Sequence, residues 1–448
     1  MKWIFVAALM LLTLLVWGLL RSRKQLLAPM CFVLAVLPFF LNYHLYVAPI
    51  SWAYWPGIVK GIEVSAVDAV AFGMLLAIGW HVETPAPLKL FMGVYLLGWV
   101  ISTATGQQMI PAVFYLWQLM RAVLVYLAVS RAVSISPEAP FALVAGLGGS
   151  VLFECVIATW QYLHGMPQAG GTLGHRTMIG IMSHSAVAPA FAMVLGGRRN
   201  WLAPLVVAAG GIIAFVGASR ATIILYGVGL IITTLLSLRH KMTGRKMGIA
   251  LVAVAVVGLG APIMKMAVGR RAEVSIESSN DERHALTDAA RMIIADHPFG
   301  VGANQYVLVA NIGGYSDRAG VSWYHESRAA PVHDMYLLVL AELGWIGFIG
   351  FVGLLMSAVL VGVKAIRRLP RTHHSELMVG AVAAIIITGI HSAFEWITMD
   401  FRMHYLIAMD IGLVTGLLAL QARKSAGGVP APKSRKRRPG QPPQPATA

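Results

Sequence analysis

The chain has 448 residues, of which 58% are hydrophobic and only 12% charged, and its mean hydropathy is +0.72. Soluble globular domains carry about 25% charged residues, so this composition excludes a soluble protein and indicates an integral membrane protein. The formal net charge is +16. It indicates no nucleic-acid partner, because the basic residues gather in short loops as the positive-inside rule describes.

Long apolar runs recur along the chain, each near the ~20 residues that a helix needs to cross a bilayer. Lipid forces every backbone polar group to be satisfied within its own segment, which helices achieve. The runs lack the alternation of barrel strands, so we predict an all-α polytopic bundle. The thirteen runs are 3–20, 25–48, 64–82, 88–103, 112–130, 139–163, 178–197, 201–218, 221–238, 247–266, 335–362, 376–395 and 404–421. Twelve spans are the alternative, because the run at 88–103 is short.

Basic residues set the expected orientation. Arg21, Arg23 and Lys24 follow the first span, and similar groups follow the seventh, ninth and eleventh. If thirteen spans alternate, all of these groups lie on one side, which the positive-inside rule makes the cytoplasm. Residues 1–266 then form about ten N-terminal spans, and the N-terminus lies outside.

Several polar residues stand out in this N-terminal part. Arg121 lies in the middle of a span, where a charge is costly and often functional; it either reaches a substrate phosphate or pairs with a carboxylate. His175 and Arg176 lie on an outer loop, where they either contact sugar or form a solvated turn. Cys31 and Cys155 fall inside predicted spans and are expected to be packed thiols, with no disulfide or metal framework.

The segment 267–332 is the only long polar loop, and it is predicted to lie outside. It holds eight acidic residues and six arginines. A loop of this length is usually functional. Apolar residues at helical spacing predict a helix over 281–296, which His297-Pro298 would end. The following Gly-Val-Gly is a weak candidate for a phosphate cradle, because the lysine of a P-loop is absent.

The segment 333–421 holds three further spans and begins with a titratable group. His333 and Asp334 stand where the polar loop enters a long apolar helix, and a histidine at a membrane boundary is suited to proton transfer. The plainer interpretation is a helix-start residue that bonds a neighbour. His391 and Glu395, one turn apart, either tune protons near this histidine or form a packing pair. Residues 422–448, basic and rich in proline and alanine, are expected to be a disordered cytoplasmic tail.

Three motifs in this order resemble the O-antigen ligase and polymerase superfamily of bacterial envelope enzymes. The first is Gly217-Ala218-Ser219-Arg220, similar to the family's Ser-Arg step. The second runs from Arg283 to the Pro298-Phe299-Gly300-Val301-Gly302 loop. The third is His333 with Glu342, Gly344 and Gly347. Residues Trp55-Pro56-Gly57, Gly61-Ile62-Glu63 and Asp68 look more like exopolysaccharide polymerases than ligases. Asp334 departs from the Asn, Ser or Gln that often follows the histidine.

The resemblance implies a metal-independent, inverting glycosyltransferase of the bacterial inner membrane, without cofactors and with its site facing the periplasm. The donor would be an oligosaccharide on undecaprenyl diphosphate and the acceptor a glycan hydroxyl, with other polysaccharide assembly and export proteins as possible partners. An imidazole, with an ordinary pKa of about 6.5, can take the acceptor proton, and arginines suit a diphosphate. We therefore assign His333 as the base and Arg220 and Arg283 as the diphosphate clamp. The residues held in reserve are Arg291, Arg121, His175, Arg176 and Asp334.

The plainer alternatives are an interface anchor for Arg220 and a solvated loop charge for Arg283. The leading function is a repeat-unit polymerase. The alternatives are a ligase that acts on lipid A-core, a polysaccharide transporter and a non-catalytic envelope scaffold. A transporter would favour two matching halves with broken helices, and neither is evident in the sequence.

Overall fold

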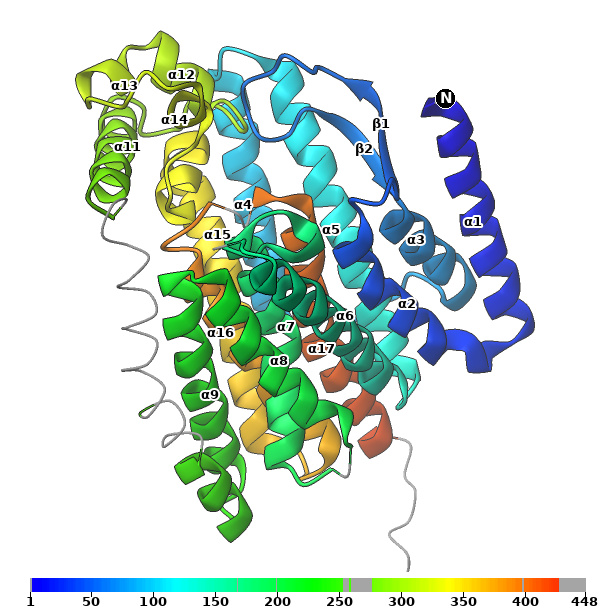
Figure 1. Ribbon diagram of the computed structural model, residues 1–448. Coiled ribbons are helices and arrows are strands. Elements are labelled where there is room, and N and C mark those ends of the chain that lie inside the picture. The colour runs from blue at the N-terminus through cyan, green and yellow to red at the C-terminus, as the bar shows by residue number, and fades with distance from the viewer. Residues whose placement is uncertain are drawn as a thin grey trace, which may run out of the picture.

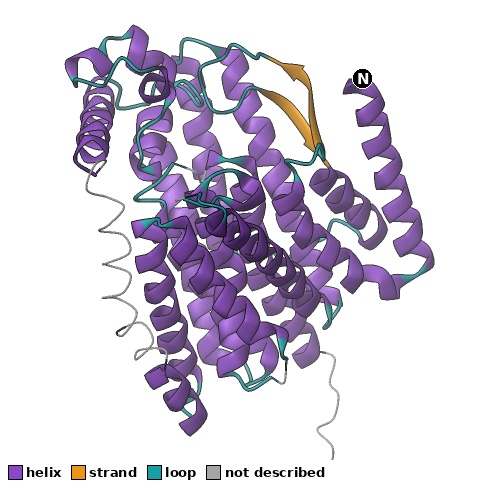
Figure 2. Cartoon of the chain, viewed as in Figure 1, coloured by secondary structure: helices purple, strands orange, loops and turns teal. Residues whose placement is uncertain are grey.

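A computed structural model describes residues 2–166, 168–198, 200–252, 258, 276–396 and 399–426. Most of this part of the chain is helical (Figure 2), which confirms the predicted all-α polytopic bundle. Within it, nine helices are long and apolar enough to span a membrane: α1 (Lys2–Ser22), α4 (Ala86–Thr105), α5 (Met109–Ile135), α6 (Ala139–Leu163), α7 (Arg176–Leu195), α9 (Arg220–His240), α15 (Met335–Arg368), α16 (His373–His391) and α17 (Phe401–Ala426).

Shorter apolar helices fill three of the other predicted spans. They are α2 (Leu27–Phe40) with the 3-10 turn η1 (Lys24–Leu26) before it, α3 (Ala66–Ile78) and α8 (Leu202–Gly217). A capping box, in which Ser65 and Asp68 bond each other's backbone N–H groups, fixes the start of α3. The predicted span 247–266 lies mostly outside the described residues, and so do the beginning of the loop 267–332 and the tail after residue 426.

The second predicted span, 25–48, is wrong at its C-terminal end. Helix α2 ends at Phe40, and β1 (Tyr46–Ser51) pairs antiparallel with β2 (Gly61–Ser65). The register shifts between Val47 and Ile50, where Pro49 has no N–H to give to the ladder. The strand was hidden because its apolar residues continue the apolar run of the helix before it.

The helices pack in pairs that are often distant in the sequence: α5 with α17, α4 with α15, and α7 with α16. Helix α7 lies at the centre of the bundle (Figure 1), and 94% of its most apolar window is buried. Glycines bring α4 and α15 close together, because a Cβ on Gly350 would lie 2.5 Å from the Cα of Tyr95.

The loop 267–332 contains the expected helix and three more. Helix α11 (Ile276–Asp296) ends just before His297-Pro298, and α12 (Tyr306–Ile312), α13 (Tyr315–Arg318) and α14 (His325–Ala329) follow. These helices share a hydrophobic cluster with the first turns of α15, and Leu286, Ile293 and Tyr306 are among its buried members. Figure 1 shows them as a cap at one end of the bundle, called here the loop end. The opposite end, where α9 and α17 terminate, is called the basic end.

Candidate functional site

The start of α15 is fixed by local hydrogen bonds that place His333 at the edge of the bundle. Asp334 is the N-cap, and its Oδ1 accepts from Tyr336 N at 2.8 Å and from Leu337 N at 3.1 Å. Burial raises the pKa of the Asp334 carboxyl, and the two backbone N–H groups oppose that rise. Asp334, held in reserve as a site residue, therefore has its carboxylate engaged in capping the helix that carries His333.

Glu395 connects His333 to Arg283. Its Oε2 lies 3.2 Å from His333 Nδ1, and its Oε1 accepts from Arg283 Nη2 at 2.9 Å. Arg283 also donates to the carbonyl of Phe394 at 3.3 Å. The Glu395 side chain is 6% exposed, compared with 28% for His333. Burial raises the pKa of Glu395, but the hydrogen bonds and charges of His333 and Arg283 outweigh burial, so its pKa lies below the ordinary value.

Glu395 lies on the segment between α16 and α17, which is tied to the start of α15. Met335 N donates to Ser392 O at 2.8 Å, so the backbone on both sides of the His333–Glu395 contact is fixed. Figure 1 shows this segment running beside the beginning of α9 and the lower part of α11. Three parts of the chain therefore meet at one carboxylate.

Two further arginines lie at helix N-termini around this carboxylate. Arg220 begins α9 and donates to Asn280 Oδ1 at 3.3 Å, and the preceding Ser219 caps that helix. Arg176 begins α7 and lies within electrostatic range of Glu395, Arg283 and Arg220. We call His333, Glu395, Arg283, Arg220 and Arg176 the His–Glu–Arg cluster. Its guanidinium groups outnumber its carboxylate, and helix N-termini add positive potential, so it is suited to a multiply charged anion.

The loop before Arg176 is held by a carboxylate on α6. Glu154 Oε2 accepts from Thr172 N at 2.8 Å, and the Thr172 hydroxyl donates to Glu154 Oε1. Gly171 has φ +61°, and a Cβ there would overlap the Glu154 carboxylate. This loop carries His175, which is exposed and lies within electrostatic range of both Glu395 and His333.

The Pro298–Gly302 loop has a structural role beside the site. Helix α15 is broken at Gly344, which has φ +64° and ψ −172°. The carbonyls of Ala341 and Glu342 instead accept from Val301 N and Gly302 N, each at 3.0 Å, and Trp345 N donates to Pro298 O at 3.2 Å. These amide groups are occupied, so the interpretation of Gly-Val-Gly as a phosphate cradle is wrong.

Glu342, nine residues after His333, stabilises the next turn of the same loop. Its carboxylate accepts from Asn304 N at 2.8 Å and from Tyr306 N at 3.1 Å. Asn304 in turn bonds Val59 N and Val59 O, at 3.1 and 2.7 Å. The second and third sequence motifs therefore form one folded unit, and Asn304 joins it to the segment before β2.

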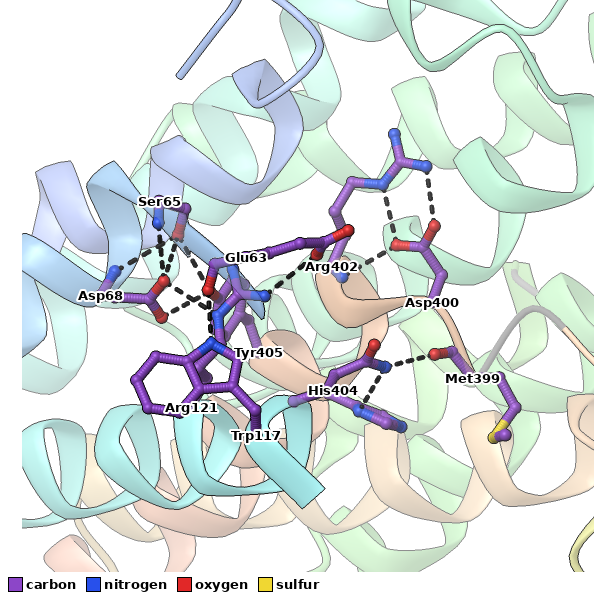
Figure 3. Close-up of polar contacts among 11 residues, drawn as sticks. Glu63, Ser65, Asp68, Trp117, Arg121, Met399, Asp400, Arg402, His404 and Tyr405 are labelled. Carbon is purple, nitrogen blue, oxygen red and sulfur yellow. Dashed lines mark hydrogen bonds and ion pairs between the residues drawn. The ribbon is translucent and has the colours of Figure 1, made fainter. Parts of the chain in front are cut away.

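Arg121 pairs with carboxylates, which was one of its two expected roles. Its Nε lies 2.9 Å from Asp68 Oδ2 and its Nη1 3.1 Å from Glu63 Oε2, while its guanidinium lies over the rings of Phe401 and Tyr405. Figure 3 shows this group beside the Asp400–Arg402 ion pair, whose closest atoms are 2.8 Å apart. Burial raises the pKa of Glu63, and Arg121 opposes that rise.

Two other residues have partners away from the His–Glu–Arg cluster. Arg291 is exposed and pairs with Asp288 on its own helix at 3.2 Å. His391 Nδ1 lies 3.1 Å from His184 Nε2 in the bundle core. Glu395, which the sequence grouped with His391 either near His333 or in a packing pair, is hydrogen-bonded to His333.

Comparison with known families gives a match to part of the chain. Residues 204–352 match the family model described as O-antigen ligase. This stretch is therefore similar to O-antigen ligases. The match supports the resemblance to the O-antigen ligase and polymerase superfamily and a membrane glycosyltransferase-like function of that type, and the apolar helices agree with a multi-pass membrane protein. No match is found among curated proteins.

The matched region, residues 204–352, runs from α8 to the middle of α15 and contains Arg220, Arg283 and His333. Arg176 and Glu395 come from outside it, on α7 and on the segment after α16. The His–Glu–Arg cluster is therefore assembled from the matched region and from helices on both sides of it.

Proposed function

We propose that the protein transfers a glycan from undecaprenyl diphosphate to a sugar hydroxyl at the periplasmic face, as an exopolysaccharide or O-antigen repeat-unit polymerase. The observation that supports this most directly is the Glu395 carboxylate, which contacts both His333 and Arg283. It holds a proton acceptor and a phosphate-binding cation in one place. A polymerase or ligase needs both groups at one bond.

His333 acts as the general base. With its Nδ1–H donated to Glu395, the neutral imidazole has Nε2 free to accept the proton of the acceptor hydroxyl. The hydroxyl oxygen then attacks the anomeric carbon of the donor. Glu395 stabilises the imidazolium that forms, and the proton leaves later to water, since His333 is partly exposed.

Arg283, Arg220 and Arg176 bind the leaving diphosphate. The bond between the anomeric carbon and the phosphate oxygen breaks as the new glycosidic bond forms, which inverts the anomeric configuration. Negative charge grows on the diphosphate in this step, and fixed guanidinium donors stabilise it there. No step uses a metal ion or a cofactor.

The orientation follows from charge. The basic end, with Arg239, Arg367 and Arg368 in the last turns of α9 and α15, would face the cytoplasm together with the C-terminal tail, and the loop end would face the periplasm of the inner membrane. The His–Glu–Arg cluster then lies on the side where lipid-linked repeat units are polymerised, within reach of other polysaccharide assembly and export proteins.

The product made by purified protein tests the proposal. The protein is incubated with an undecaprenyl-diphosphate oligosaccharide, with and without a lipid A-core acceptor, and the products are separated by size. Chain growth on the donor lipid supports a polymerase, whereas transfer only to lipid A-core shows a ligase. No transfer of either kind by correctly folded wild-type protein would contradict the proposal. The same assay with chelator is expected to give unchanged turnover, and a loss restored by a divalent ion would contradict metal independence.

A further inference from the structure

The basic end of the bundle holds a cavity lined by two arginines, far along the helices from the His–Glu–Arg cluster. It has a volume of about 450 Å³ and is lined by Val194, Arg198, Asn200, Trp201, Pro204 and Arg245. It lies where α7 ends and α8 begins, next to the helical residues that follow α9. No part of the proposed transfer reaction uses it.

The two arginines in this cavity have no acidic partner among the described residues. The neighbouring Lys246 provides the contrast, because it is buried and pairs with Glu376 at 2.6 Å. Arg198 is instead held over the ring of Phe141, with its Cζ 3.4 Å from the ring centroid. Two guanidinium groups in the lining of one cavity, without a carboxylate in that lining, form a candidate site for an anion.

The turn after α7 is shaped around Arg245. Gly197 has φ +76°, a conformation that favours glycine. A Cβ at Gly197 would lie 3.1 Å from Arg245 Nη1, so the guanidinium of Arg245 lies against this turn.

The surroundings indicate a lipid as the source of the anion. A small adjoining crevice of about 30 Å³ shares Arg198 and Asn200 with the cavity and continues between α6 and α8, where Val144, Ala190 and Val206 line it. Trp201 at the rim is 77% exposed, and exposed tryptophans gather at the level of lipid headgroups. A phosphodiester at the arginines, with the tryptophan at headgroup level beside it, matches this lining.

We propose that this cavity binds the phosphate headgroup of an anionic phospholipid, with Arg198 and Arg245 as the ligands. The proposal does not depend on the proposed transferase activity. If the basic end faces the cytoplasm, the lipid comes from the inner leaflet, where anionic headgroups attract basic residues.

Native mass spectrometry of the full-length protein in detergent tests this site. Phosphatidylglycerol should bind more tightly than phosphatidylethanolamine. A basic residue near an anionic surface contributes about 1 kcal/mol, so the combined Arg198→Gln and Arg245→Gln substitutions should weaken phosphatidylglycerol binding roughly 25-fold. Arg239→Gln is the control, because it removes one exposed charge from the same end outside the cavity lining. Equal binding by the double variant and the control would overturn the proposal.

Two further arms keep the test decisive. Inorganic phosphate is added as a competitor, and it should not displace the lipid; displacement at similar concentrations would show a free-phosphate site and overturn the lipid assignment. If the double variant does not fold, the single variants and a salt titration of the wild type replace it. Each single variant should weaken binding about fivefold, and wild-type affinity should fall with added salt. Affinity that is independent of salt would contradict an electrostatic headgroup site.

Discussion

At the scale of single residues, one carboxylate, Glu395, connects the His–Glu–Arg cluster, and none of the sequence motifs contains it. His333, Arg220 and Arg283 were identifiable because their motifs occur in a fixed order in the sequence. Glu395 was named only as one of two alternatives for a pair with His391, because no spacing rule relates it to a histidine 62 residues earlier. Its role follows from tertiary packing of the α16–α17 segment against α15, which sequence periodicity does not encode.

His333→Ala should lower transfer by about 10²- to 10⁴-fold, the usual effect of losing a general base. Binding of the donor should remain, since the arginines are intact. His333→Gln should be no better, because an amide can bond the hydroxyl but cannot take its proton. Turnover of a lipid-linked donor measures both variants. Substantial activity in the glutamine variant would make His333 a positioning group instead.

Arg283→Lys and Arg220→Lys should each lose most activity although the charge is kept. Lysine cannot offer paired donors to a diphosphate, and one lost charge-assisted hydrogen bond costs about 1.5–3 kcal/mol, or roughly tenfold or more in rate. Arg291→Lys on the same helix is the control, because Arg291 pairs with exposed Asp288. Near-normal turnover in both test variants, at normal expression, would rule out the clamp.

Glu395→Gln should change the pH dependence of transfer. The carboxylate stabilises the protonated imidazole of His333, so its removal should move the acidic limb of the rate profile to lower pH while lowering the maximal rate. If the acidic limb stays at the same pH, Glu395 does not influence proton transfer by His333.

The stability of the fold should also depend on Glu395. The pKa of Glu395 is below its ordinary value, so the stability that it contributes is present above its unfolded pKa of about 4.3 and is lost as pH falls through the lower folded value. The thermal advantage of wild type over Glu395→Gln should persist down to about pH 4.3 and shrink below it. An advantage already lost near neutral pH would contradict this assignment.

At the scale of elements, the sequence predicted most helices well because apolar runs of membrane length leave few alternatives. It failed where a run contained two kinds of structure, as at residues 46–51. It also missed the break in α15, because a glycine in a helical pattern does not reveal a positive φ. The break is stable only because the Pro298–Gly302 loop supplies the missing hydrogen-bond partners.

Gly344→Ala should destabilise the loop end. Its backbone conformation is unfavourable for alanine by about 1–3 kcal/mol, and the new Cβ would lie 2.6 Å from the Cα of Phe299. The fall in melting temperature, followed in detergent, should be accompanied by lost transfer because His333 and Arg283 flank this unit. Gly93→Ala in α4 is the control, because its Cβ meets open space. Equal melting temperatures for the two variants would contradict the structural role of Gly344.

At the scale of the whole molecule, the orientation rests on the distribution of charge between the two ends. Ser316, in the middle of the loop 267–332, is only 3% exposed. A cysteine introduced there would therefore react poorly with a thiol reagent. Tyr324 is 78% exposed at the loop end, and Met242 is 70% exposed at the basic end. The native Cys31 and Cys155 are buried, so introduced cysteines at these exposed positions report the topology.

Tyr324→Cys should react with an impermeant thiol reagent in intact cells, and Met242→Cys should react only after the inner membrane is permeabilised. The physical reason is the excess of basic residues around position 242. The reverse pattern would place the His–Glu–Arg cluster in the cytoplasm and would exclude a periplasmic polymerase.

The contact between His333 and Glu395 also sets an order in time. Synthesis proceeds from the N-terminus, so His333 and Arg283 are already made while the carboxylate is still to come, 62 residues behind His333. Helix α16 must cross the bilayer before Glu395, which follows its last residue His391, can reach the loop end. We therefore expect a chain that ends after α15 to lack transfer although it carries the whole matched region 204–352, so activity should begin only when insertion is nearly finished.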